Sequence, residues 1–179
     1  MHKIAIFWFI LISLLSTNGF AQKFKIGDTA PDFTVKSGSN SIVNLKMNFG
    51  KTVFLFYETK DVVEKNRKLK QKLNEFYNIQ PDSIKRYIER LTVIDCTSAF
   101  WPFTGIWESK LVENSIIEEM TLYGDWDGKM KRSYSMKNNE SNIFVIDKKG
   151  IIRYVNSGRT NDDEIGRIIK LLNDLGNEK

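Results

Sequence analysis

The sequence predicts an α/β fold in which a central mixed β-sheet is flanked by helices and preceded by an N-terminal β-hairpin. Continuous apolar runs at residues 53–57 and 91–95 are typical of central strands that are buried on both faces. An amphipathic pattern lies between them, so strand, helix and strand are expected to form one βαβ crossover. Two further apolar runs on either side of residues 148–150 predict a terminal hairpin.

The elements of the first half follow in order along the chain. Residues 33–36 and 42–45 flank the turn-rich segment 37–40 and are expected to pair as the N-terminal hairpin. After the strand at 53–57, apolar residues recur with helical spacing over residues 62–77. Lysine and arginine occupy much of the rest of this helix. We interpret these basic residues as a solvated face rather than as a binding patch.

The second half predicts shorter elements and one unusual loop. Residues 100–107 hold four aromatic side chains broken by Pro102 and Gly105, which indicates a stiff apolar loop that leads into a helix. Before this loop we expect a short helix after Pro81 and the strand at 91–95, and after it a helix at 108–114. A strand at 120–123, a turn at 124–128 and a short helix at 129–134 are expected to follow. The chain is then expected to end with strands at 142–147 and 151–155 and an amphipathic helix at 162–175.

Residues 1–21 have the pattern of a secretory signal peptide. A positive start is followed by an apolar stretch over residues 4–15 and by small residues at Gly19 and Ala21. The apolar stretch is short for a membrane span, and no cysteine follows it that could carry a lipid anchor. We therefore expect residues 22–179 to form a single domain without a transmembrane segment, in the periplasm or outside the cell.

Charge, cysteine and histidine content narrow the function classes. The chain has 27 Lys and Arg against 22 Asp and Glu, and the bases are spread among the acids, so an exported nucleic-acid binder is not expected. Cys96 is the single cysteine, which excludes an internal disulfide. The single histidine, His2, lies in the predicted signal peptide. We therefore expect no zinc or transition-metal site, no histidine-dependent catalytic pair and no cofactor.

Two segments resemble the thioredoxin superfamily. Residues 25–33 are similar to the opening segment of its peroxiredoxin and thiol-reductase branch, and residues 51–66 resemble its strand, active loop and first helix. The resemblance implies a thioredoxin-like three-layer sandwich. In dithiol members the loop reads Trp-Cys-x-x-Cys, whereas here Asp61 and Glu64 stand at the cysteine positions and Ser141 at the position of the cis-proline. Without the two thiols, dithiol disulfide exchange is not expected.

One family within this superfamily is the best match. The Glu-Lys-Asn sequence at 64–66, together with residues 105–115 and 140–150, resembles the YtfJ-type proteins. These are exported bacterial thioredoxin-fold proteins that also lack the Cys-x-x-Cys pair and whose biochemical role is undefined. The resemblance runs over residues 24–175. It implies that the protein is located in the periplasm or is secreted, and it assigns no catalytic residue to this chain.

The acidic residues at the two cysteine positions of the active loop, called the degenerate loop below, have two interpretations. Asp61-x-x-Glu64 at a helix start is a capping-box pattern, in which an aspartate accepts from a backbone amide and an acidic first turn suits the helix dipole. This is the interpretation that we favour. Alternatively, Asp61 and Glu64 could hold a hard cation together with Glu58, because such ions prefer oxygen ligands.

We expect the protein to bind a protein or peptide of the bacterial envelope without redox chemistry. The predicted surface is the groove near Asp61 and Ser141, because thioredoxin-like folds hold extended chains there through backbone hydrogen bonds that need no thiol. Trp101, Phe103 and Trp107 of the aromatic loop are candidate contacts. The same aromatic residues fit core packing beneath a helix equally well, and both interpretations stay open at this point.

An enzyme is the alternative, in the form of a single-thiol reductase or peroxidase that uses Cys96. This cysteine closes the apolar strand at 91–95 and has neither a neighbouring histidine nor a helix N-terminus to lower its pKa. We therefore favour a packed and inert thiol.

Overall fold

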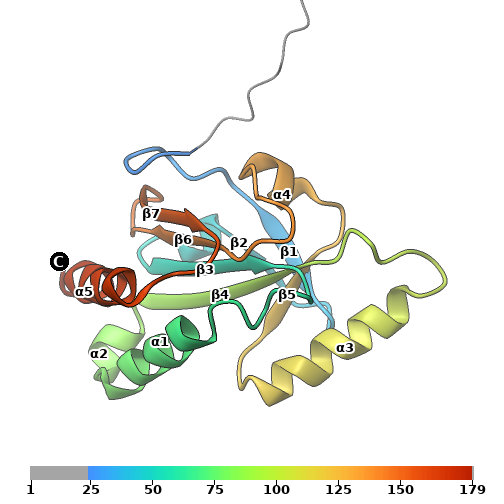
Figure 1. Cartoon of the computed structure of the whole chain (residues 1–179), viewed down its shortest axis with the longest axis horizontal. Coiled ribbons are helices and arrows are strands. Elements are labelled where there is room, and N and C mark those ends of the chain that lie inside the picture. Colours follow the sequence, from blue (N-terminus) through green and yellow to red (C-terminus); the bar gives the residue numbers. More distant parts are fainter. Residues whose placement is uncertain (1–23, 179) are drawn as a thin grey trace, which may run out of the picture.

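The computed structural model describes residues 24–178, and the predicted signal peptide lies outside them. Seven strands form one mixed sheet with helices on both faces (Figure 1). No helix within the described residues is both long and apolar enough to span a membrane. The elements are β1 Thr34–Ser37, β2 Ile42–Asn44, β3 Thr52–Glu58, α1 Arg67–Ile79, α2 Asp82–Lys85, β4 Ile88–Asp95, α3 Thr104–Ile117, β5 Leu122–Asp125, α4 Lys129–Ser133, β6 Asn142–Ile146, β7 Ile152–Ser157 and α5 Asp162–Asn177.

The strand order is β2-β1-β5-β4-β3-β6-β7, and the predicted α/β class with an N-terminal hairpin is confirmed. β3, β4 and β5 run parallel at the centre, while β1 and β6 join them in antiparallel orientation. All seven residues of β3 are buried, as expected for a continuous apolar run at the middle of a sheet. In the hairpin, Val35 pairs with Val43, so both valines point to the same face.

The sheet separates two main hydrophobic cores because side chains alternate between the faces of a strand. Leu55 and Tyr57 of β3 point to the face that is covered by α4 and the N-terminal segment. Phe54 and Phe56 point to the opposite face, where α1 and α5 cover them. α3 lies on that second face beyond α1 and adds a smaller cluster around Leu111 (Figure 1).

The helix after β3 starts later than predicted, and the predicted capping box is wrong. Residues 59–66 form successive turns, and α1 begins at Arg67 with Asn66 at the N-cap position. The Asn66 side chain donates to the Gly158 carbonyl and accepts from the Thr160 amide, both at 2.8 Å. These long-range bonds hold the chain at Asn66, so Asp61 lies more than one turn before the helix.

Candidate binding groove beside the degenerate active loop

A groove runs between α1 and α3 over the sheet. One part holds about 110 Å³ between α1 and β4, and a second part holds about 450 Å³ beneath the first turns of α3. Both parts are mainly apolar, and four residues line them in common: Val63, Ile94, Asn114 and Leu122. The shared lining shows that the two parts adjoin, and together they are called the groove below.

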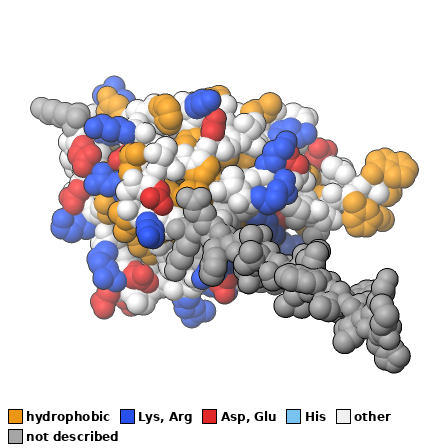
Figure 2. Space-filling model, turned by 90° about the horizontal axis from the view of Figure 1, so that it is seen from above, with side chains coloured by type: hydrophobic (Ala, Val, Ile, Leu, Met, Phe, Trp, Pro, Cys, Tyr) orange, Lys and Arg blue, Asp and Glu red, His pale blue; other side chains and the backbone are white. Residues whose placement is uncertain are grey.

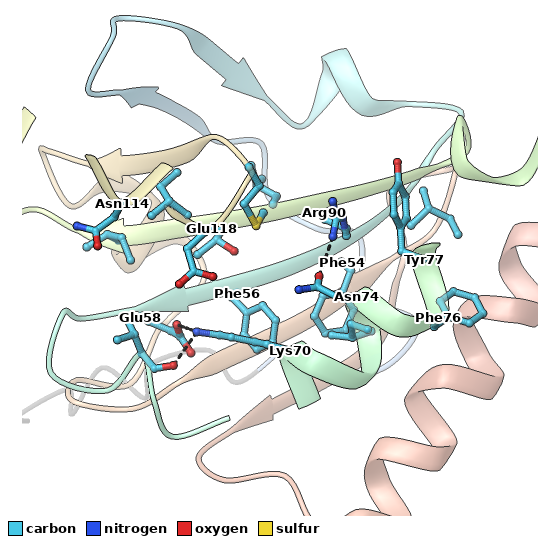
Figure 3. A pocket seen from close by; sticks show the side chains of 18 of the residues that line it. Phe54, Phe56, Glu58, Lys70, Asn74, Phe76, Tyr77, Arg90, Asn114 and Glu118 are labelled. Carbon is cyan, nitrogen blue, oxygen red and sulfur yellow. Dashed lines mark hydrogen bonds and ion pairs between the residues drawn. The ribbon is translucent and has the colours of Figure 1, made fainter. Parts of the chain in front are cut away.

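A buried ionic network lies where the two parts of the groove adjoin (Figure 3). Glu58 has no exposed surface, and its Oε2 atom lies 2.6 Å from Nζ of Lys70. The same Nζ atom donates to the Val63 carbonyl at 2.7 Å and lies 5.1 Å from the centre of the Phe56 ring. Burial raises the pKa of Glu58, and the ion pair with Lys70 opposes that shift.

The third member of this network is Ser141, for which the sequence comparison suggested the position of the cis-proline. Ser141 is fully buried, and its hydroxyl donates to Oε1 of Glu58 at 2.6 Å. The Ser141 carbonyl accepts from the Gly158 amide at 2.9 Å. The one cis peptide bond recorded over residues 24–178 is Trp101–Pro102, so the bond before Ser141 is trans. Glu58 and Ser141 therefore shape the groove from within and present no surface to a partner.

Polar side chains along the middle of the groove are paired with one another. Arg90 donates to the Asn74 amide oxygen at 2.7 Å, and its guanidinium lies 4.1 Å from the centre of the Tyr77 ring. Figure 3 shows these residues on the α1 side, with Asn114 and Glu118 across from them. Arg90 and Asn74 thus pair with each other, while the lining of this part of the groove is mainly apolar.

The carboxylates of the degenerate loop do not come together. Asp61 is exposed and pairs with Lys60 at 2.8 Å, while Glu64 is exposed and pairs with Arg67, whose hydrogen bond lowers the pKa of Glu64. Glu58 is taken by Lys70 in the interior. No group of three acidic, histidine or cysteine side chains that could hold a metal occurs within residues 24–178. The cation site that was considered from the sequence is therefore not assembled.

Lys65 ties the active loop to the segment before β6. Its ammonium lies 2.5 Å from Glu140, and the next residue, Asn66, makes the two bonds to the β7–α5 segment described above. The Glu-Lys-Asn sequence at 64–66 thus has a structural explanation. Lys65 and Asn66 join this loop to distant segments, and Glu64 pairs with a neighbour on the surface.

The aromatic segment at 100–107 divides into two parts. Phe100, Trp101 and Phe103 are exposed to 65%, 87% and 47% and do not line the groove. Trp107 is partly buried, packs against the cluster around Leu111 and lines the outer part of the groove. The sequence left open whether these aromatic residues are exposed or packed in the core. Phe100, Trp101 and Phe103 are exposed, and Trp107 is packed.

Cys96 is packed, as expected. It has no exposed surface and lies in the cluster beneath α3 with Ile94 and Leu122. Burial, together with the nearby carboxylates of Asp95 and Asp125, raises the pKa of the thiol to about 12. The thiolate needed for a nucleophilic reaction is therefore strongly disfavoured at neutral pH in the folded protein.

Comparison with protein families places this chain in one of them. A model described as "Bacterial protein of unknown function (YtfJ_HI0045)" matches residues 59–175. The chain belongs to this family. No curated protein matches the sequence. The YtfJ-type family that the sequence predicted is thereby confirmed.

Solved structures confirm the thioredoxin-like fold of this YtfJ_HI0045 member. A proposed thiol:disulfide interchange protein DsbE from Chlorobium tepidum is 22% identical, with a TM-score of 0.60 over 86% of this chain and 99% of that chain. The thioredoxin domain of a thiol-disulfide oxidoreductase from Bacteroides vulgatus is 19% identical, with a TM-score of 0.59 over 84% and 99%. A peroxiredoxin-like protein from Aquifex aeolicus is 17% identical, with a TM-score of 0.54 over 84% and 89%.

Lys70 is the groove residue of this YtfJ_HI0045 member that the sequence did not reveal. The sequence pattern assigned it to the solvated face of the helix, whereas its ammonium reaches back to Glu58. One signal was present, because Glu58 directly follows a continuous buried run and a buried carboxylate requires a partner. Five basic residues near the start of the helix could supply that partner. The position at which α1 begins determines which of them reaches Glu58.

Proposed function

We propose that this YtfJ_HI0045 family member is an exported, redox-inactive binding module that holds a protein or peptide of the bacterial envelope. The observation that carries the proposal is the open apolar groove between α1 and α3, directly beside a loop from which both redox cysteines are missing. The groove offers apolar burial, which is the main source of affinity for a peptide side chain.

Redox inactivity is supported by two features of the site. The cysteine positions hold Asp61 and Glu64, whose carboxylates pair with Lys60 and Arg67. The one thiol of the chain, Cys96, is buried and has a raised pKa. A single-thiol reductase or peroxidase would need both access to this sulfur and its thiolate form, so we do not favour that alternative.

The contact surface that we propose differs in part from the set suggested by the sequence. Trp107 and Ile106 of α3 line the outer part of the groove together with Val63 from the active loop. Glu58 and Ser141 are buried beneath the junction of the two parts and hold β3 to the segment before β6. Asp61 and Glu64 lie exposed on the same loop and supply charge at its surface.

A displayed library of random peptides, selected on the immobilised protein, tests the binding function. We expect selected peptides to share apolar residues, and Ile106→Asp to weaken their binding by at least about tenfold because it places a charge in the groove. Ile117→Asp is the matched control, since Ile117 lies at the other end of α3, is 67% exposed and does not line the groove.

Two results would contradict the proposal. Peptides that bind both aspartate variants equally well would place the binding surface outside the groove. Peptides that are retained only through Cys96, and released by a reductant, would favour the thiol-dependent alternative. Export is tested separately, by determining the N-terminal residue of the protein from an envelope fraction, where Gln22 is expected.

A further inference from the structure

The tip of the loop before α3 presents three aromatic side chains that the groove does not use. Phe100 and Trp101 are more than half exposed, and Phe103 is nearly so. Residues 96–107 contain no charged side chain. A contiguous exposed apolar patch on a folded domain marks an interaction site, because leaving it in water is unfavourable.

The tip has a defined shape and projects from the body of the protein. The rings of Phe100 and Phe103 pack edge to face with their centroids 5.3 Å apart, and the Phe103 amide donates to the Phe100 carbonyl at 2.7 Å. Figure 1 shows the β4–α3 loop extending beyond the sheet, and Figure 2 shows hydrophobic side chains gathered at that end of the molecule. The tip is therefore a preformed convex knob.

We propose that this aromatic tip, formed by Phe100, Trp101 and Phe103, inserts into the interfacial layer of an anionic lipid bilayer. A convex knob requires a partner that closes around it, and a bilayer does so without a matching pocket. Tryptophan at the extremity favours the boundary between head groups and acyl chains, and phenylalanine favours the apolar side of that boundary. The proposal does not depend on the peptide-binding function of the groove.

Two exposed lysines near the tip are the cations that would meet lipid phosphates, each with the loss of one surface ion pair. Lys60 and Lys110 line the outer part of the groove together with Ile106 and Trp107, which belong to the first turn of α3 after the tip. Both lysines are mostly exposed and pair with exposed acids, Asp61 and Glu113, which are weak partners that a lipid phosphate can replace. The whole chain carries a formal net charge of +5, which favours approach to an anionic surface.

An environment-sensitive probe at the tip tests the insertion in the full chain. Trp101→Cys in a Cys96→Ala background is labelled with nitrobenzoxadiazole and mixed with vesicles of phosphatidylethanolamine and phosphatidylglycerol. We expect emission from the probe to rise severalfold and to shift to the blue. The matched control carries the label at Ile117→Cys, an exposed apolar site at the other end of α3, where no change is expected.

The probe also separates tip insertion from the other ways in which the chain could reach a vesicle. Attachment through apolar residues 4–15 alone gives binding without a change at Trp101, and that result overturns the proposal. Equal changes at both labelled sites indicate unspecific adsorption and overturn it as well. A change at Trp101 that appears without lipid and grows with protein concentration indicates a second copy as the partner, with the same consequence.

A second measurement avoids any change at the buried cysteine. Wild type and Trp101→Phe are compared in vesicles that contain brominated lipids, which quench tryptophan at the depth of the bromine atoms. We expect quenching of the wild type to exceed that of the variant, because the variant keeps the other tryptophans and loses only the residue at the tip. Equal fractional quenching of the two proteins overturns the proposal.

Discussion

The Ser141 hydroxyl donates a 2.6 Å hydrogen bond to Oε1 of Glu58, and neither residue has exposed surface. Glu58 ends β3 directly before the degenerate loop, and Ser141 stands where a dithiol thioredoxin fold has its cis-proline. The bond therefore joins the end of β3 to the segment before β6. With Lys70 on the other carboxylate oxygen, a buried ionic network holds these two segments together.

Glu58→Ala is expected to lower the free energy of unfolding by about 2–3 kcal/mol. Removing one member of a buried ion pair leaves the other charge uncompensated, and here the partial exposure of Lys70 reduces that cost. Urea denaturation measures the loss. Glu64→Ala is the matched control, since its pair with Arg67 lies on the surface and its removal should change stability by less than about 0.5 kcal/mol. Similar losses in both variants would contradict a structural role for the network.

The same carboxylate makes stability depend on pH. Because burial raises the pKa of Glu58, the folded state binds this proton more tightly than the unfolded state. Its contribution therefore favours the folded state at low pH and is lost as the pH rises above the ordinary value of 4.5. Glu58→Gln lacks this contribution. We expect the free energy of unfolding of wild type, relative to that of Glu58→Gln, to fall as the pH rises above that value. Urea unfolding in a pH series measures both proteins. A difference between the two free energies that does not change with pH would refute this prediction.

Cys96 should react with iodoacetamide only after the protein unfolds. The thiol is buried and its raised pKa leaves little thiolate at neutral pH. Mass spectrometry after timed alkylation should show an unmodified native chain and a single adduct in denaturant. Rapid labelling under native conditions would contradict the packed state and would revive the single-thiol enzyme.

Asn66→Ala is expected to cost about 2 kcal/mol. The amide side chain satisfies the Gly158 carbonyl and the buried Thr160 amide, and its removal leaves both without these partners. Thermal unfolding compares it with Asn177→Ala, whose exposed side chain bonds only within the last turn of α5. An equally small effect of the two changes would show that the link between the α1 start and the β7–α5 segment is dispensable.

Asp61→Lys is expected to leave the free energy of unfolding within about 0.5 kcal/mol of wild type, because Asp61 is exposed and does not cap a helix. The same change should weaken capture of the selected peptides if the surface of the loop contributes to binding. A loss of about 1 kcal/mol without weaker capture would instead support a capping role.

The strands and most of the helices could be predicted because their signals are local. The buried run of β3 and the helical spacing of α5 depend on neighbouring residues, and both elements lie within two residues of the predicted bounds. The predicted start of α1 was wrong because contacts between distant parts of the chain determine it. Asp61-x-x-Glu64 fits a capping box, but Asn66 bonds to Gly158 and Thr160 more than ninety residues away.

From the sequence alone followed the α/β class, the hairpins, the missing redox cysteines and the burial of a strand-end thiol. Only the tertiary structure decided which charge neutralises Glu58, that Ser141 is turned inward, and that Trp107 packs while Trp101 stays exposed. Helices and strands are predictable from residue periodicity, because that pattern depends only on neighbouring positions in the chain. The partner of a buried carboxylate and the exposure of a loop depend on segments that meet only after the sheet has formed.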